Sequence, residues 1–371
     1  MPYPQLDRHA LQMLPLKSRN HRKTIAHDRV PIDRQPVPLP AAQHELLAQC
    51  AQRIATARQH GRSVMLAYGA HAIKNGLGPV MVELMQRGWL THLATNGAGI
   101  IHDWEFSYIG QSCEDVRAMV SIGQFGNWQE TGFYVNLALN VGAYEGLGYG
   151  ESLGALIHNE GLTIPAADQL RDEVQRDLSD NPAQSAAAAD LLSIVERFQL
   201  PAGHMDVAHP SQQYSVQANA YRLKIASTGH PMIGHDIIYN HPMNHCASLG
   251  RTAERDFLAY AEGVSRLQGG VYLSMGSAVM SPMIFEKSLS MARNLAKQRD
   301  ESIDDFQIVV NDLAQCNWDW SQGEPPEDNP AYYLRYNKTF ARMGGQLHYV
   351  QADNRDFLLT LMHELEGYAS A

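Results

Sequence analysis

Short apolar runs of strand length alternate with amphipathic segments along most of the chain, and this alternation limits its possible folds more than any other feature. The run "SVMLAYGA" (63–70) predicts a buried strand, and "GPVMVELMQRG" (78–88) predicts a helix that ends at Gly88. "LTHLAT" (90–95) predicts the next strand, and a helix is expected to open near Asp103. Strands and helices in this order are typical of a parallel α/β sheet.

The same alternation returns in the second half of the chain. Strand-like runs occupy 269–276, 305–312 and 346–352, and the segments 283–298 and 355–366 have helical periodicity. We therefore predict an α/β fold: a doubly wound, mostly parallel sheet with helices on both faces.

The ends of the chain and one internal segment depart from this pattern. Residues 1–40 are rich in proline and basic residues and predict an extended arm, which could lie on a neighbouring subunit. Residues 41–371 are predicted to form a single domain that opens with a helix over 41–60. A helical insertion is expected at about 155–200.

Composition excludes several classes of protein. The chain has 371 residues, 44% hydrophobic and 18% charged, and a formal net charge of −10. This charge argues against a nucleic-acid surface, and no apolar run approaches the ~20 residues of a membrane span. No signal peptide is visible, and the four cysteines form no CxxC pair, so a reducing cytoplasmic compartment is expected. These cysteines are Cys50, Cys113, Cys246 and Cys316.

Small or polar residues follow most of the predicted strands. The turns are "YGAHAIKNGLGP", "TNGAGIIHD", "SMGSAVMSP", "VVNDLAQ" and "VQADNRD". Such turns let backbone N–H groups approach a phosphate, and a helix N-terminus adds a favourable dipole. None is the GxGxxG fingerprint, so glycines needed only for tight packing are an open alternative. Asp353 could bind a ribose hydroxyl or simply cap the following helix.

Several segments, in order, resemble the deoxyhypusine synthase family between about residue 60 and residue 366. They are "GAHAIKNGLGPVMVELMQRGWLTHLATNGAGIIHD", "HPMIGHDIIYNH", "GGVYLSMGSAVMSPMIFEKSLSMARN", "RYNKTF" and "LHYVQADNRDFLLTLM". The resemblance implies a doubly wound fold, bound NAD, and a homotetramer with sites at subunit interfaces. In that family NAD takes a hydride from spermidine, and a lysine captures the aminobutyl group as an imine.

The resemblance assigns roles to residues of this chain. Lys338 matches the lysine that forms the imine, and Asp236 and His241 complete the expected catalytic group. The expected cofactor-binding residues are Thr95, Asn96, Gly97, Ala98, Gly276, Ser277, Asp312 and Asp353. The expected substrate-binding residues are His102, Asp103, His235, Asp328 and Tyr336.

The chain also departs from the family pattern. Where the family has an acidic pair this sequence has Ile101 and His102, and Ser281 stands where a histidine is expected. A pocket with fewer carboxylates should prefer a substrate less cationic than spermidine, because a buried ammonium needs a paired charge. We therefore expect an amine-transforming enzyme of the homospermidine synthase type rather than true deoxyhypusine synthesis.

Two other functions are consistent with the sequence. The missing acidic residues favour a relative that binds NAD or another nucleotide without catalysis. Alternatively, the histidine-rich segment could support a metal-assisted hydrolase or lyase, although no zinc-type spacing is present and no metal is assigned. Its histidines are His204, His209, His230, His235, His241 and His245.

Overall fold

A computed structural model describes residues 3–368, which separate into two compact units built from interleaved segments. The helical unit comprises Met1–His27, Ile100–Asn219 and Pro231–Asp256. The sheet unit comprises Asp28–Gly99, Ala220–His230 and Phe257–Ala371. The sequence predicted one domain after residue 40, whereas the chain returns to each unit more than once.

A six-stranded sheet forms the centre of the sheet unit, and its neighbouring strands are all parallel. Its strands are β2 (Val64–Tyr68), β3 (His92–Thr95), β7 (Ala226–Gly229), β8 (Val271–Met275), β9 (Gln307–Asp312) and β10 (Gln346–Gln351). Their order across the sheet is β10-β9-β8-β2-β3-β7. Counted in chain order from the β7 edge this is 3-2-1-4-5-6, the order of doubly wound dinucleotide-binding folds. The predicted fold class is therefore confirmed.

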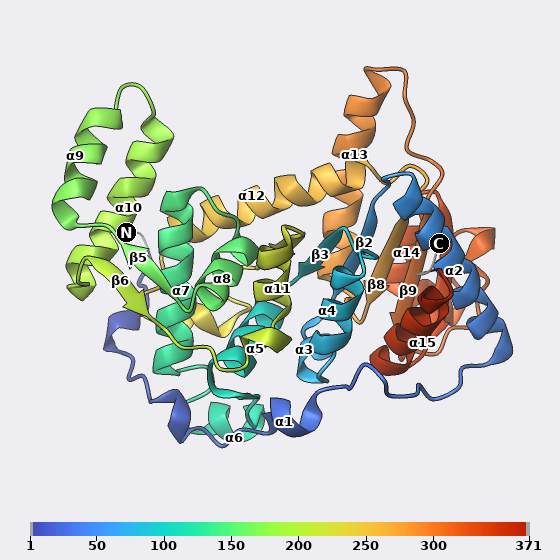
Figure 1. Ribbon diagram of the computed structural model, residues 1–371, viewed down its shortest axis with the longest axis horizontal. Coiled ribbons are helices and arrows are strands. Elements are labelled where there is room, and N and C mark those ends of the chain that lie inside the picture. The colour runs from blue at the N-terminus through green and yellow to red at the C-terminus, as the bar shows by residue number, and fades with distance from the viewer. Residues whose placement is uncertain (1–2, 369–371) are drawn as a thin grey trace. The chain divides into compact units, whose positions relative to one another are not determined.

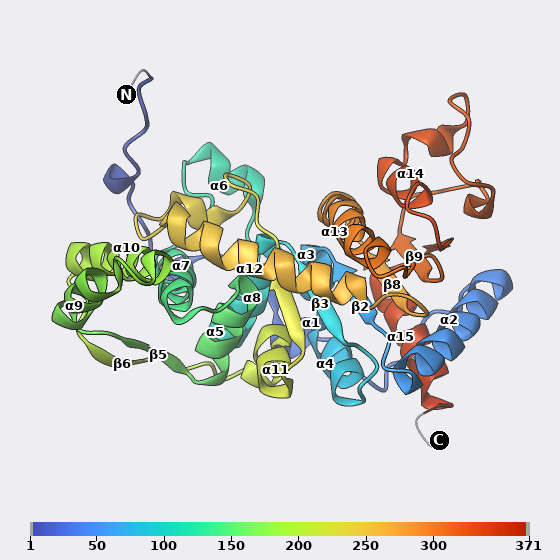
Figure 2. The same ribbon diagram turned by 90° about the horizontal axis from the view of Figure 1, so that it is seen from above.

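Helices cover both faces of this sheet (Figure 2). One face carries α2 (Ala41–Gln59), α4 (Gly78–Gln86) and α15 (Asn354–Glu366), and the other carries α13 (Met280–Lys297) and α14 (Arg335–Ala341). The central strands β2, β3 and β8 are buried along their whole length because both sides are covered, which is usual in parallel sheets. Each predicted strand and helix of this unit is present within a few residues.

The helices of the helical unit (Figure 1) share an apolar core. This core includes Trp104, which has no exposed surface. Its main elements are α5 (Gly97–Ile109, from Ile100 onward), α7 (Gln129–Glu145), α8 (Tyr149–His158), α9 (Ala167–Asp177), α10 (Pro182–Phe198), β5 (Gly161–Ile164) and β6 (Gly203–Asp206). Helix α5 begins six residues before Asp103, because Gly97 already follows the end of β3. Helices α9 and α10 account for the predicted helical insertion.

Shorter elements and the helices α11 and α12 complete the fold. They are α1 (Ile25–Asp28), α3 (Ala70–Lys74), α6 (Val116–Ser121), α11 (Val216–Leu223), α12 (Cys246–Ser265), β1 (Lys23–Thr24), β4 (Gln111–Ser112), and 3-10 turns at Arg8–Ala10, Leu16–Ser18, Gln212–Tyr214, Ile237–Asn240, Trp320–Gln322 and Pro330–Tyr333. No helix among residues 3–368 is long and apolar enough to cross a membrane.

The first part of the N-terminal arm docks on the chain's own helical unit. Leu14 donates its backbone N–H to Asn127, and Ile25 donates its backbone N–H to Gly110. Between them, β1 pairs with β4 in antiparallel register. The arm was predicted to be extended, with a neighbouring subunit as a possible place for it to lie. Residues 14–25 form backbone hydrogen bonds with this chain's own helical unit, and any contact with a second subunit stays a prediction.

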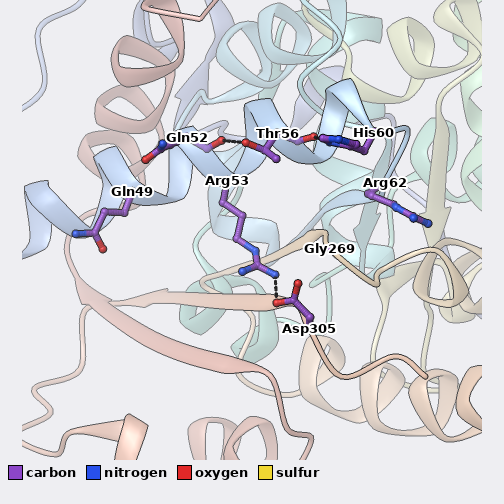
Figure 3. A pocket seen from close by; sticks show the side chains of 8 residues that line it. All are labelled: Gln49, Gln52, Arg53, Thr56, His60, Arg62, Gly269 and Asp305. Carbon is purple, nitrogen blue, oxygen red and sulfur yellow. Dashed lines mark hydrogen bonds and ion pairs between the residues drawn. The ribbon is translucent and has the colours of Figure 1, made fainter. Parts of the chain in front are cut away.

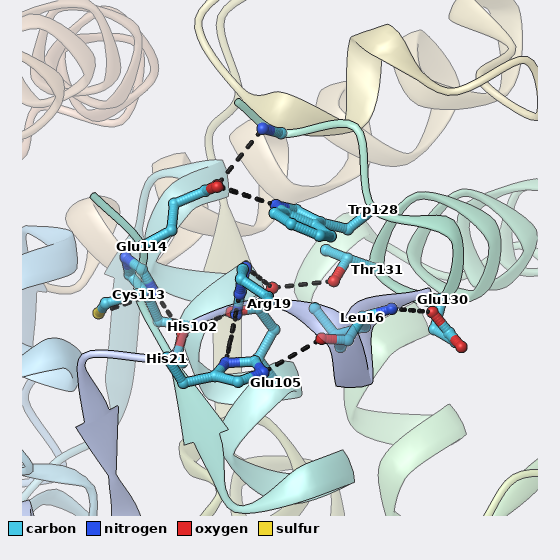
Figure 4. Close-up of polar contacts among 12 residues, drawn as sticks. Leu16, Arg19, His21, His102, Glu105, Cys113, Glu114, Trp128, Glu130 and Thr131 are labelled. Carbon is cyan, nitrogen blue, oxygen red and sulfur yellow. Dashed lines mark hydrogen bonds and ion pairs between the residues drawn. The ribbon is translucent and has the colours of Figure 1, made fainter. Parts of the chain in front are cut away.

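A buried ion pair anchors the arm (Figure 4). The Arg19 guanidinium donates to both carboxylate oxygens of Glu105 at 2.9 and 2.6 Å, and their side chains are 2% and 1% exposed. Thr131 and Ser112 donate their hydroxyls to the same carboxylate at 2.8 and 2.5 Å. Burial alone would raise the pKa of Glu105, but Arg19 offsets this, and the pKa lies below its usual value.

We expect Arg19→Met to destabilise the protein by about 3–5 kcal/mol, because it leaves the Glu105 carboxylate buried without its cation. Arg22→Met is the matched control, since Arg22 pairs with Asp115 on the surface and such pairs contribute about 0–1 kcal/mol. Urea unfolding of both variants measures the two effects. Equal destabilisation by the two substitutions would contradict the anchoring role of Arg19.

Candidate functional site

The carboxyl ends of the sheet strands lie side by side, so the turns that follow them share one edge of the sheet. The Gly69 N–H donates to the Met275 carbonyl at 3.0 Å, and the Gly276 N–H donates to the Asn311 carbonyl at 2.9 Å. Each strand therefore stays in register with its neighbour up to its last residue. Ligands of open parallel sheets bind at this edge, at the position where the strand order reverses.

That position lies between β2 and β8, where two glycines meet. A Cβ atom built on Gly69 would overlap the carbonyl oxygen of Gly276, so no larger residue fits without movement. Gly276 has φ +57°, and a Cβ there would press against the side-chain amide of Asn354. The backbone at this point is consequently bare of side chains, as close approach by a ligand requires.

The N-terminus of α13 opens directly after this glycine pair. Its N-cap residue, Val279, makes no side-chain capping hydrogen bond. Ser277 lies one turn ahead, and its Oγ accepts from the Ser281 N–H at 3.2 Å. Pro282, the third residue of this 18-residue helix, has no N–H, so the helix dipole and the Met280 N–H are what its N-terminus can offer to an anion.

A second helix start, that of α5, lies after β3. Thr95 donates its hydroxyl to the Tyr68 carbonyl at 2.9 Å and so fastens β3 to β2. Asn96 accepts from the Gly99 N–H at 2.9 Å through Oδ1. Two of the predicted cofactor residues therefore have structural roles here, and Gly97 and Ala98 offer backbone at the same edge.

The two predicted carboxylates stand after the last two strands. Asp312 Oδ1 accepts from the Ala314 N–H at 3.1 Å. Asp353 is the N-cap of α15 and accepts from the Arg355 guanidinium at 2.8 and 2.9 Å. Arg355 lowers the pKa of Asp353, which keeps that carboxyl ionised. Asp353 is thus a helix cap, and its ribose-binding role stays a prediction.

Lys338 lies on α14 and is held as an ammonium ion. Its Nζ lies 3.1 Å from Glu324 Oε1 and 3.2 Å from the centroid of the Tyr332 ring. These two partners raise its pKa above the usual value. A lysine that attacks a carbonyl or imine carbon needs a neutral amine and a lowered pKa. The contacts of Lys338 instead raise its pKa and favour the protonated form.

Two other predicted residues, Asp103 and His241, are buried in the helical unit. Asp103 accepts from the Ser215 hydroxyl at 2.6 Å and from the N–H groups of Val216 and Gln217, so it caps α11. Burial raises its pKa to about 6.

His241 packs on α7 with 3% of its surface exposed. Its Nδ1 accepts from the Met243 N–H at 3.0 Å, which places the ring proton on Nε2, 3.3 Å from Gln129 Oε1. Gly132 provides the space for this ring, since a Cβ there would overlap it. Burial lowers the pKa of His241 to about 4, so the ring is neutral at pH 7.

The remaining predicted residues are dispersed among several elements. His102 Nδ1 lies 2.7 Å from the Ser112 hydroxyl, and Asp236 precedes the turn at Ile237–Asn240. His235 and Asp328 are exposed, and Tyr336 packs partly against the core of the sheet unit. Within residues 3–368 no group of three or more His, Cys, Asp or Glu side chains is placed to hold a metal ion.

A buried hydroxyl chain under the β8 turn was missed by sequence reasoning. Tyr260 donates to Tyr272, whose hydroxyl lies 2.8 Å from Ser281 Oγ, and Ser274 donates to Ser281 at the same distance. Ser281 is the position where the family's histidine was expected. The sequence feature that could have indicated this hydroxyl chain is the alternation in "VYLSMG", which places Tyr272 and Ser274 on one face of the strand.

A shallow pocket of about 450 Å³ lies at the opposite, amino edge of the sheet (Figure 3). It is lined by the second half of α2 and by the residues that precede β8 and β9. Arg53 spans it and pairs with Asp305 at 2.6 Å. None of the predicted cofactor residues lines this pocket.

Comparison with known proteins gives only distant likenesses. No family model matches the chain, and no curated protein matches it. Among solved structures, the arginine dihydrolase ArgZ of the cyanobacterial ornithine–ammonia cycle is 14% identical with a TM-score of 0.41, over 87% of this chain and 33% of its own. AgrE, solved with ornithine and NAD⁺, is 14% identical with a TM-score of 0.44, over 90% of this chain and 35% of its own.

A LOR/SDH protein from Methanococcus maripaludis S2 is 14% identical with a TM-score of 0.41, over 91% of this chain and 74% of its own. This chain thus spans about a third of ArgZ and AgrE. At these values the likenesses assign no family, substrate or cofactor to this protein.

We expect Glu324→Gln to lower the pKa of Lys338, because the substitution removes the anion that stabilises its ammonium. Glu327→Gln, in the same loop, is the matched control that leaves the Lys338–Glu324 pair intact. NMR titration of ¹³C-methylated lysines, assigned with Lys338→Arg, measures both. An unchanged pKa in Glu324→Gln would show that the ion pair does not hold the proton on Lys338.

Proposed function

We propose that the sheet unit binds NAD at the junction of β2 and β8, and that the protein is an NAD-dependent enzyme acting on an amine. One observation carries the cofactor half of this proposal: the 3-2-1-4-5-6 strand order with Gly69 and Gly276 in contact where the order reverses. The amine half rests on the resemblance of "RYNKTF" and its companion segments to deoxyhypusine synthases.

The residues at the junction fit a dinucleotide. The bare backbone at Gly69 and Gly276 gives room for a pyrophosphate, and the N-terminus of α13 adds a favourable helix dipole. Ser277 already accepts the Ser281 N–H and Pro282 has no N–H, so Met280 is the residue in the first three of α13 whose N–H could donate to a phosphate oxygen. In the usual dinucleotide-binding fold, the helix that binds the phosphates follows the first strand directly, which here is β2. Helix α3 has only five residues here, so α13 takes that role.

When bound, NAD would accept a hydride from the carbon that bears the substrate's amine. Lys338 would then have to release Glu324 and lose its proton before it could form an imine. The ammonium described above is therefore the resting state of this residue in the proposed reaction.

The contacts of Lys338 with Glu324 and Tyr332 favour a second candidate function, cofactor binding without amine transfer. In that case Glu324 and Tyr332 hold Lys338 permanently, and the pair only ties α14 to the loop before it. Borohydride reduction in the presence of NAD and an amine separates the two functions. A covalent adduct that is lost in Lys338→Arg supports amine transfer, and the absence of any adduct supports cofactor binding alone.

We expect NAD to bind the wild-type protein and Ala278→Glu to weaken that binding about tenfold or more. Ala278 is exposed and precedes the N-cap residue of α13, and a carboxylate there repels a phosphate by ~1 kcal/mol or more at ~4 Å. Gln298→Glu adds the same charge at the other end of α13 and is the matched control. Calorimetric titration with NAD measures all three proteins. Wild-type protein that fails to bind NAD, or equal binding by both variants, would overturn the proposed site.

A further inference from the structure

A groove in the helical unit, remote in sequence from the residues assigned to NAD, has the lining of a ligand site. It has a volume of about 220 Å³ and is lined by residues of α7 and α8 and of the β5–β6 hairpin. This is smaller than the pockets that hold drug-sized ligands, so it suits a small molecule.

The floor of the groove is apolar and closely packed. Val141 of α7, Leu156 of α8 and Leu162 of β5 line it, and each is buried. A Cβ atom on Gly142 would overlap the Ser152 hydroxyl, so the two helices approach as closely as their backbones allow beneath the groove. A surface of this kind favours an alkyl chain.

One end of the groove carries an unpaired carboxylate. Glu145 is the last residue of α7, where the helix dipole disfavours a negative charge. Among the described residues, none makes a hydrogen bond or ion pair with the Glu145 side chain. Arg255, which reaches the end of α7, donates instead to the carbonyls of Ala143 and Leu147.

Glu145 is exposed as a whole residue, and desolvation of its carboxyl by the surrounding groove raises its pKa. A ligand cation would supply the missing partner. The groove is also lined by the polar side chains of Asn159 and Thr163 and by His204, whose Nε2 lies 3.4 Å from Asp206 Oδ1.

We propose that this groove binds a small linear organic cation, with its alkyl chain on the Val141–Leu156–Leu162 floor and its charged end on Glu145. The proposal does not depend on NAD binding. An ammonium and a guanidinium satisfy the same site, because both offer N–H donors and a positive charge to a carboxylate. The groove belongs to the helical unit, whereas the proposed cofactor site belongs to the sheet unit.

Hexylamine is the probe, with 1-hexanol and hexanoate as neutral and anionic molecules of the same length, and hexylguanidine as the second cation. We expect hexylamine to raise the melting temperature of the full-length protein, because a ligand of the folded state stabilises it. Hexanol should act more weakly and hexanoate not at all. Equal shifts of the melting temperature with hexylamine and hexanoate would overturn the proposal. The ratio of the affinities for hexylguanidine and hexylamine shows which of the two cations the groove prefers.

Three variants locate the binding. Glu145→Gln keeps the size of the side chain and should lose at least tenfold in hexylamine affinity by calorimetry, with no loss of melting temperature. Ala155→Met places a larger side chain into the groove and should also weaken binding. Asp172→Asn removes an exposed charge from α9 in the same unit and should leave affinity unchanged. Full affinity in Glu145→Gln would refute the site, whatever the behaviour of Ala155→Met.

Discussion

The parallel pairing of β2 with β8 is the constraint on which the sheet unit depends. These two strands are far apart in sequence, and their pairing requires the whole of the helical unit's central segment to be made in between. Once they pair, their carboxyl ends bring Gly69 against Gly276, and the helices that follow leave on opposite faces of the sheet. The cofactor site we propose is a direct result of that divergence, and it needs no sequence fingerprint in a single turn.

The sequence was sufficient to predict the sheet because each strand leaves a local signal. The apolar runs at 63–70 and 269–276 are buried on both faces and became β2 and β8. The same reasoning placed Gly97, Gly276 and Asp312 at the carboxyl edge of the sheet, because the turns that follow parallel strands lie at that edge. Strand β7 was missed because "ASTG" is short and polar, and its place at the sheet edge is set by pairing with β3.

The predicted site residues fared differently because their roles depend on partners that are distant in sequence. Lys338 was assigned a reactive amine, but Glu324 and Tyr332 make it a stable ammonium ion. Asp103 was expected to contact substrate, yet it caps α11 more than a hundred residues later in the chain. His241 is neutral and buried because Gly132 of α7 accommodates its ring. No local pattern encodes such contacts, so a sequence can nominate these residues without fixing what they do.

The docked arm also has a consequence for how the protein is made. Arg19 leaves the ribosome 86 residues before the carboxylate that neutralises it, and the strand pairing that flanks it also waits for later sequence. The arm can therefore dock only after Glu105 and its strand partners Gln111 and Ser112 have been synthesised. Anything that holds the arm away from the helical unit would leave the Glu105 carboxylate inside the protein without its cation.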